Sequence, residues 1–376
     1  MHGILKAAAA SLILTASAAE TQRVWLGTTG QDEAKGIYTA EFDPQSGKLS
    51  APTLAAEVPR PGFLTLSKEG GFLYSTSLTE PADGGRPEGA VAAFAIEGAT
   101  LKELNRQESG GGGPCFVALD ANGKTLMVAN YGGGSVASFP VKPDGSLGPR
   151  ASLGQHEGSS VNPKRQQAPH AHSIYPGPDN RFAYAPDLGI DEVVIYELDA
   201  TAAKLTPAGS AKTPPGSGPR HMKFGRDGRQ AYVLGELDLT VIVYDRGTRN
   251  GMLTRRQVLS VLPDDADGSD MTCSEILVSA DGKHVYTANR DVGDRGRDTL
   301  SVFRVEDEGR LKRIQTLPAE VSIPRNIQLS PDGRWLLVAG QKSGGVPVFR
   351  VGDDGMLKFS GHRAELPGAM CIVFAP

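Results

Sequence analysis

Short runs of alternating apolar and polar residues recur in pairs along the chain. Within a pair, the two runs are joined by a turn of the Asp-Gly type. Clear copies are PCFVALDANGKTLMVAN from Pro114, PRHMKFGRDGRQAYVLGE from Pro219 and PRNIQLSPDGRWLLVAGQ from Pro324. A period of two predicts half-buried β-strands, and an Asp-Gly turn between two such strands predicts an antiparallel hairpin.

The hairpin returns about every 50 residues, and a third strand such as SVASFPV or LSVFRV usually follows it. Several units add a fourth strand, as in LTRRQVLS. Four strands at this period are typical of a β-propeller blade. The last copy, PGAMCIVFAP from Pro367, lacks its outer strands, which VWLGTT, IYTAEF and TLAAEV near the other end can supply. We therefore predict an all-β, seven-bladed β-propeller with four antiparallel strands per blade, closed by N- and C-terminal strands.

The first residues have a different character. They contain a lysine, an apolar stretch and the small-residue sequence Ala-Ser-Ala at 16–18. This order is typical of a cleavable secretory signal, and the stretch is shorter than the ~20 residues that span a bilayer. A disordered Ala-rich terminus is the alternative. We predict a signal peptide over 1–19, a single propeller domain over 20–376, a periplasmic or secreted location and no membrane span.

Charge and cysteine content exclude other classes. The chain has 39 Lys and Arg against 43 Asp and Glu, so the basic surface of a nucleic-acid-binding protein is not expected. Its three cysteines are too few for a disulfide framework. A closed ring leaves no sheet edge that needs a partner, which favours a monomer.

The repeat also locates a candidate site. The start of the first strand and the end of the second strand of each hairpin meet at one face of the ring, around the mouth of the channel. Polar residues gather at these positions, whereas the opposite hairpin ends hold ordinary turns. The charged members of this set are Arg220, Arg290, Arg325, His172, His221, Glu236, Glu275 and Asp187.

Several of the same segments resemble the lactonase family of seven-bladed propellers, which includes 6-phosphogluconolactonases and carboxymuconate-cyclising enzymes. The matching motifs are Asn130-Tyr131-Gly132-Gly133, Pro169-His170-Ala171-His172-Ser173, Gly218-Pro219-Arg220-His221, Glu236-Leu237, Asn289-Arg290, Pro324-Arg325-Asn326 and Gly340-Gln341. The resemblance implies that a lactone ring is opened or closed without a nicotinamide or flavin cofactor. It also implies that His172, Arg220, Glu236 and Arg290 are catalytic, with His170 competing for the role of the histidine.

Lactone hydrolysis requires an activated water, a stabilised oxyanion and a proton for the leaving alkoxide. We expect Glu236 to have a raised pKa and act as general base, and His172 to donate the proton. Arg220 and Arg290 would hold the oxyanion or a substrate anion. The substrate is expected to be a small anionic or polyhydroxylated lactone. Its predicted binding residues are His170, His221, Glu275, Arg325, Asn326, Gln341, Asp187, Asn130 and Tyr131.

The polar segment 155–168 precedes the His170 motif and is expected to form a rim loop or lid, or simply a solvated loop. Its Lys164 and Arg165 can attract an anion. His170 and His172 offer a metal pair without a third ligand at matching spacing, so we predict no metal. Two other functions fit the sequence: a muconate-type cyclising isomerase, and a non-catalytic exported propeller that binds a partner.

Overall fold

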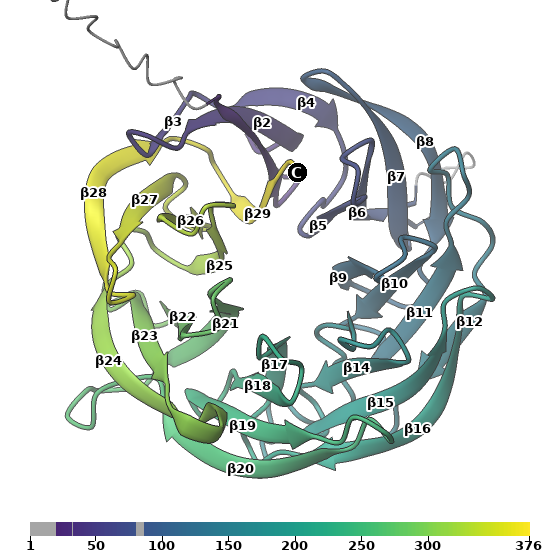
Figure 1. Cartoon of the computed structure of the whole chain (residues 1–376). Coiled ribbons are helices and arrows are strands. Elements are labelled where there is room, and N and C mark those ends of the chain that lie inside the picture. The colour runs from purple at the N-terminus through teal and green to yellow at the C-terminus, as the bar shows by residue number, and fades with distance from the viewer. Residues whose placement is uncertain (1–19, 32, 80–85) are drawn as a thin grey trace, which may run out of the picture.

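The computed structural model describes residues 20–31, 33–79 and 86–376, so the predicted signal peptide over 1–19 lies outside the described residues. The described chain is a ring of seven antiparallel sheets around a central channel (Figure 1). The predicted all-β, seven-bladed propeller is confirmed. Over these same ranges the helical structure is one 3-10 turn, η1 (Asp307–Gly309), and no helix is long and apolar enough to cross a membrane.

Six blades are formed by four consecutive strands each. The first blade contains β5 (Leu64–Leu66), β6 (Phe72–Leu78), β7 (Gly89–Glu97) and β8 (Thr100–Glu108). The second contains β9 (Pro114–Leu119), β10 (Thr125–Asn130), β11 (Ser135–Pro140) and β12 (Ser152–Gln155). The third contains β13 (Tyr175–Pro176), β14 (Phe182–Asp187), β15 (Glu192–Asp199) and β16 (Lys204–Lys212).

The fourth blade contains β17 (Pro219–Phe224), β18 (Gln230–Gly235), β19 (Thr240–Arg246) and β20 (Leu253–Ser260). The fifth contains β21 (Met271–Val278), β22 (His284–Asp291), β23 (Thr299–Val305) and β24 (Leu311–Pro318). The sixth contains β25 (Pro324–Leu329), β26 (Trp335–Gly340), β27 (Val346–Val351) and β28 (Leu357–Ala364).

The seventh blade joins the two ends of the chain. Its inner strand is β29 (Ala369–Phe374), and β1 (Gln22–Thr28), β2 (Gly36–Asp43), β3 (Lys48–Leu49) and β4 (Thr53–Glu57) complete it. β29 pairs antiparallel with β1, with Leu26 opposite Ile372. The ring therefore closes as predicted, through main-chain hydrogen bonds between segments at opposite ends of the sequence.

Aromatic side chains pack at this closure. Phe42 is fully buried, and its ring lies edge-on to Phe374 and Trp335, with centroids 5.4 and 6.4 Å away. The indole Nε1 of Trp335 donates a hydrogen bond of 2.9 Å to the carbonyl of Pro44. Packing and a directed polar contact thus join the closing blade to the sixth blade.

A one-residue irregularity recurs where the inner strands reach the mouth of the channel. In the second blade Ala129 pairs with Phe116 and Asn130 with Pro114, so Cys115 has no partner. The same shift occurs at Ser274, Arg325 and Met370, and a wider one covers Arg220 and His221. A β-bulge of this kind bends the strand and re-aims the extra side chain.

The third blade departs furthest from the regular strand pattern. Its inner strand β13 has two residues, and a separate bridge pairs Ala171 with Asp187. The amide of His172 still donates to the carbonyl of Pro186, at 2.9 Å. The inner part of this blade is thus an irregular segment that carries His172 to the channel.

We predict that Phe42→Ala lowers the free energy of unfolding by about 3–5 kcal/mol, because it removes a fully buried ring at the closure. Denaturant unfolding followed by fluorescence measures this loss. Phe359→Ala, on the partly exposed face of β28, is the matched control and should cost clearly less. Equal losses of unfolding free energy in the two variants would contradict a special role for the aromatic cluster around Phe42.

Candidate active site

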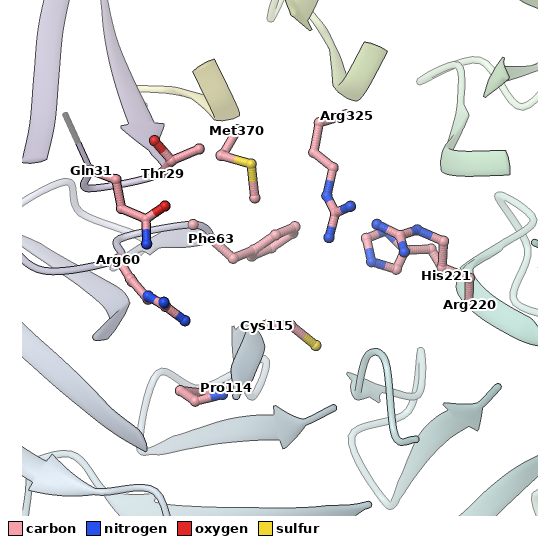
Figure 2. A pocket seen from close by; sticks show the side chains of 11 residues that line it. Thr29, Gln31, Arg60, Phe63, Pro114, Cys115, Arg220, His221, Arg325 and Met370 are labelled. Atoms are coloured by element: carbon pink, nitrogen blue, oxygen red, sulfur yellow. The ribbon is translucent and has the colours of Figure 1, made fainter. Parts of the chain in front are cut away.

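Two adjoining cavities open at the mouth of the channel. The Glu236 cavity has a volume of about 460 Å³ and includes Tyr131, Arg165, His172, Glu236, Thr272 and Arg290 in its lining. The Phe63 cavity has a volume of about 300 Å³ and includes Thr29, Gln31, Arg60, Phe63, His221 and Met370 (Figure 2). Cys115, Arg220 and Arg325 line both. The two cavities therefore share part of their wall.

The carboxylate of Glu236 lies at the centre of an arginine cluster. Its Oε2 accepts a hydrogen bond of 2.7 Å from Arg220 Nη1 and lies 3.3 Å from Arg290 Nη2. Its Oε1 accepts a hydrogen bond of 2.8 Å from Arg165 Nη2. The side chain is buried, so these charge-assisted contacts replace water.

The expectation that Glu236 has a raised pKa is wrong. Burial does raise the pKa of this carboxyl, but Arg290, Arg220 and other neighbouring positive groups outweigh burial and hold the pKa well below its ordinary value. Glu236 is therefore a stable carboxylate at neutral pH. A carboxylate with so low a pKa is a weak base, and its geometry suits it to hold guanidinium groups in place.

His172 is a neutral imidazole. Burial, followed by the positive charge of Arg220, lowers its pKa well below the ordinary value. Arg220 Nη1 contacts Nε2 of this ring, and because arginine can only donate, Nε2 is the acceptor and the ring proton lies on Nδ1. A neutral ring has no second proton to give, so the predicted role as resting-state proton donor does not fit this protonation state.

Two further guanidinium groups are incompletely paired. Arg290 donates through Nη2 to the carbonyl of Cys273 at 2.7 Å, while its buried Nε has no acceptor among the described residues. Burial lowers the pKa of Arg290 to about 10. Over the same described ranges, the side chain of Arg325 makes no hydrogen bond or ion pair. Burial and then Arg220 hold its pKa well below the ordinary value, and an anionic ligand would relieve this repulsion.

The loop over 155–168 is held by hydrogen bonds within the loop, and it reaches the Glu236 cavity. Asn162 Oδ1 accepts hydrogen bonds from the amides of Lys164 and Arg165, at 3.0 and 3.2 Å. Gln166 Nε2 donates to the carbonyl of Leu188 at 2.8 Å and so fixes the loop to the third blade. Held in this way, Arg165 contacts Glu236 and donates to the Tyr131 hydroxyl at 3.1 Å. The sequence pointed to Arg165 only as an attractor of anions.

A second chain of polar contacts links the inner strands of neighbouring blades. His221 Nδ1 lies 2.9 Å from Glu275 Oε1, and Asn326 Nδ2 donates to Glu275 Oε2 at 2.7 Å. Asn326 Oδ1 in turn accepts from the amide of Ile372 at 3.0 Å. These predicted substrate-binding residues connect four neighbouring blades. Burial lowers the pKa of His221 to about 4, whereas Glu275, whose pKa burial raises, is held at about 2 chiefly by His221.

Six predicted residues lie outside the lining of both cavities: Glu275 and Asn326 of the polar chain, and Asn130, Gln341, Asp187 and His170. Asn130 is buried and donates through Nδ2 to Ser135 Oγ, and the amide of Gln341 donates to the carbonyl of Ile323 at 3.0 Å. Asp187 accepts from the amide of His170 at 2.7 Å and contacts His156 Nδ1 at 2.6 Å, so it organises the loops. His170 stacks on Tyr131 and donates through Nδ1 to its carbonyl at 2.9 Å. The geometry thus places His172, and not His170, in the lining of the Glu236 cavity.

The sequence did not single out several residues that the structure brings to the site. Thr272, Thr29, Gln31, Arg60 and Met370 line the cavities. Among them only Met370 had a signal in the repeat, because it occupies the same bulged position as Cys115 and Arg325. Throughout the described ranges, no three His, Cys, Asp or Glu side chains are grouped so that they could hold a metal ion.

Comparison with known proteins identifies the family of this chain. The model of the lactonase, 7-bladed β-propeller family matches residues 23–374. The chain belongs to this lactonase family. The prediction of an enzyme of the lactonase class is thereby confirmed.

The lactonase family includes named relatives of similar length. The chain is 34% identical to the 6-phosphogluconolactonase of Bacillus subtilis, over 93% of this chain and 97% of that protein. It is 30% identical to the 6-phosphogluconolactonase of Formosa agariphila, over 86% and 90% of the two chains. The structure of PpgL, a periplasmic gluconolactonase of Pseudomonas aeruginosa, superposes with a TM-score of 0.87 at 30% identity and covers 95% of this chain and 99% of that one.

We predict that stability falls as the pH drops below about 6.5. The unfolded His221 takes up a proton near its ordinary pKa, whereas the folded residue resists protonation until about pH 4. At about pH 5 this single group costs about 2 kcal/mol of unfolding free energy. Denaturant unfolding over a pH series measures the slope.

His221→Gln should make this slope shallower by the contribution of one proton. His362→Gln, on the outer strand β28, is the control and should keep the parent slope. An unchanged slope in His221→Gln would show that the buried ring is not the group that titrates.

Proposed function

We propose that this chain is an exported lactonase that hydrolyses a sugar lactone at the Glu236 cavity. The observation that carries the proposal is the convergence of one neutral imidazole, one carboxylate and four guanidinium groups on that cavity. The family and the named relatives support the same reaction class. Four cations around one carboxylate favour a ligand that carries or develops negative charge.

His172 is the base that activates water. Its low pKa keeps the imidazole unprotonated at neutral pH, and its acceptor nitrogen Nε2 faces Arg220 in the cavity. When Arg220 turns an N–H toward the lactone oxygen, this nitrogen takes the proton of the water that attacks the carbonyl carbon.

The arginines stabilise the charge that develops. As the carbon–oxygen bond forms, the carbonyl oxygen becomes an oxyanion, which Arg220 and the unpartnered Nε of Arg290 can bind. Collapse of the tetrahedral intermediate breaks the ring C–O bond. The imidazolium of His172 then returns the proton to the leaving alkoxide. The new carboxyl group gives its remaining proton to solvent, so the open-chain hydroxy acid is released as its carboxylate.

Glu236 positions these groups. Its two oxygens hold three of the arginines, so the donors are oriented before substrate arrives. Preorganised donors in a desolvated site stabilise a developing oxyanion more than mobile donors in water do, because they need no reorganisation during the reaction.

Export is the second part of the proposal. It rests on the signal-like pattern over 1–19 and on the similarity to a periplasmic gluconolactonase. The propeller over 20–376 would then act as a single domain outside the cytoplasm. Fractionation of cells that express the full chain tests this directly, and recovery of the uncleaved chain in the cytoplasm would contradict it.

We expect the purified protein to hydrolyse glucono-δ-lactone or its 6-phosphate faster than the spontaneous reaction, with muconolactone as the comparison substrate. A pH-stat that records proton release measures all three. Turnover of muconolactone alone would favour the cyclising class. Turnover of none of them, in folded protein, would contradict the proposed function.

We predict that His172→Gln lowers kcat by about 10²–10⁴-fold, the loss typical of removing a general base. His170→Gln is the matched control, because His170 lies outside both cavities and stacks on Tyr131. It should lose clearly less activity. An inverted order of the two losses would assign the chemistry to His170.

The pH profile tests the same assignment. His172 acts in its neutral form, and its pKa is lowered. We therefore expect kcat/KM to fall only below about pH 6.5, which is the ordinary pKa of a histidine side chain. We expect the rate at about pH 6 to remain within about twofold of the plateau. An acid limb centred above about pH 6.5 would contradict a buried neutral base.

A further inference from the structure

Asp191 is a buried carboxylate that the proposed mechanism does not use. It lies in the turn between β14 and β15, directly before β15, and its exposed fraction is 5%. It is outside the lining of both cavities, so it does not touch a ligand bound in them. Burying a carboxylate costs free energy unless hydrogen bonds replace its water. The donors that surround Asp191 therefore indicate what this group does.

Three donors replace that water, and they come from two separate segments. Asp191 Oδ2 accepts a hydrogen bond of 2.5 Å from Ser160 Oγ and one of 2.6 Å from the amide of Gly216. Its Oδ1 accepts from the amide of Gly218 at 2.7 Å. Among the described residues, no positively charged side chain is paired with this carboxylate. Asp191 thus joins the loop over 155–168 to the segment that connects β16 with β17.

The loop leads from Asp191 to Arg165. The amide of Ser160 donates to the carbonyl of Gln166 at 2.9 Å, which closes the short stretch that carries Arg165. The side chain of Arg165 is 37% exposed, whereas those of the other two arginines paired with Glu236 are 3% and 7% exposed. Surrounding protein therefore holds Arg165 less than it holds the other two, and its position depends most on the loop.

The segment between β16 and β17 leads from Asp191 to Glu236. The carbonyl of Gly218 accepts a hydrogen bond of 2.9 Å from the amide of Glu236. Gly218 also directly precedes β17, whose second residue is Arg220. Asp191 therefore lies behind both partners of the ion pair between Arg165 and Glu236.

The backbone of Asp191 is itself held in an uncommon conformation. Its φ angle is +56°, in the left-handed region, which Asp and Asn enter more readily than other residues that carry a side chain. Its carbonyl accepts hydrogen bonds from the amide and the hydroxyl of Thr213, at 2.9 and 3.0 Å. The carboxylate is thus presented from a fixed backbone, as a positioning group requires.

From these contacts we propose that Asp191 is a positioning residue that holds Arg165 against Glu236. It does so by fixing Ser160 on one side and the segment 216–218 on the other. The inference rests on the proposed function, in which Glu236 orients the groups that stabilise the oxyanion. Without this anchor the guanidinium of Arg165 would exchange its ion pair for water. Glu236 would then lose one of its three cations and orient the remaining donors less well.

Ser160→Ala tests the loop side of this anchor. It removes one hydroxyl and leaves the two amide bonds of Asp191 in place, so the fold should be retained. We expect kcat for the lactone that the parent turns over to fall by about 3- to 30-fold with little change in KM, as for a charge-assisted hydrogen bond lost at one remove from the reaction. Ser160→Thr keeps the hydroxyl and should recover most of this loss.

Ser146→Ala is the matched control. The Ser146 hydroxyl donates to a carboxylate oxygen of Asp144 at 2.7 Å, in the turn between β11 and β12 and away from the mouth. This variant also loses one serine–aspartate hydrogen bond, and its kcat should equal that of the parent.

A double-mutant cycle distinguishes positioning from general support of the fold. Arg165→Met removes the group that Ser160 is proposed to hold in place. In that background Ser160→Ala should lower kcat by less than about twofold further, because no guanidinium is left to misplace. Losses that multiply in the double variant would show that Ser160 acts independently of Arg165 and would overturn the proposal.

Labelling of arginine with phenylglyoxal gives a readout that needs no turnover. Peptide mass spectrometry measures the rate at Arg165, and Arg229, whose side chain is 74% exposed, is the internal reference. We expect Ser160→Ala and Asp191→Asn to raise the rate at Arg165 by at least about 3-fold, because the ion pair with Glu236 opens more often, and to leave the rate at Arg229 unchanged. Asparagine suits the left-handed backbone, so Asp191→Asn should fold.

The labelling separates the two proposals. An unchanged rate at Arg165 in both variants overturns the positioning role, whether or not the parent hydrolyses a lactone. A raised rate at Arg165, in a folded protein that turns over no lactone, overturns the proposed function and leaves the anchoring of Arg165 by Asp191 standing.

Discussion

The carboxylate of Glu236 is the constraint on which the site depends. Arg165, Arg220 and Arg290 come from three separate parts of the chain, and their guanidinium groups would repel one another in a buried space. A single negative charge, shared between two oxygens, makes their approach possible. The same arginines hold the pKa of Glu236 low, whereas burial and then Arg220 lower the pKa of His172 and keep it neutral. Charge states and positions are therefore determined together.

The propeller supplies this arrangement through a repeated distortion. A regular inner strand would alternate its side chains between the two faces of its sheet, and few would point into the channel mouth. The bulges at Cys115, Arg325 and Met370 turn one extra residue toward the mouth in each blade concerned. The repeat thus provides rigid strands for stability and, at one fixed position, freedom to vary the side chain that lines the cavities.

Sequence alone predicted the architecture because each hairpin carries its own signal. The alternation of apolar and polar residues and the Asp-Gly turns are local signals in the sequence. Equivalent positions in the repeat must lie on the same face of the ring, so the sequence predicted that His172, Arg220, Glu236 and Arg290 lie near one another. Ionisation could not be predicted, because the pKa of Glu236 depends on the balance between burial and neighbouring arginines. Arg165 and Arg60 could not be placed either: each lies on a loop whose path is set by contacts far away in the sequence, such as Gln166 with Leu188.

The pairing of β1 with β29, which closes the ring, determines when the Phe63 cavity is complete. The Phe63 cavity is walled on one side by Thr29 and Gln31, beyond β1, and by Met370 of β29. These walls come together only after the last strand has docked beside the first. During synthesis the earlier blades can form in sequence, but this pocket cannot exist in any partial ring. The Phe63 cavity is thus complete only in the closed ring.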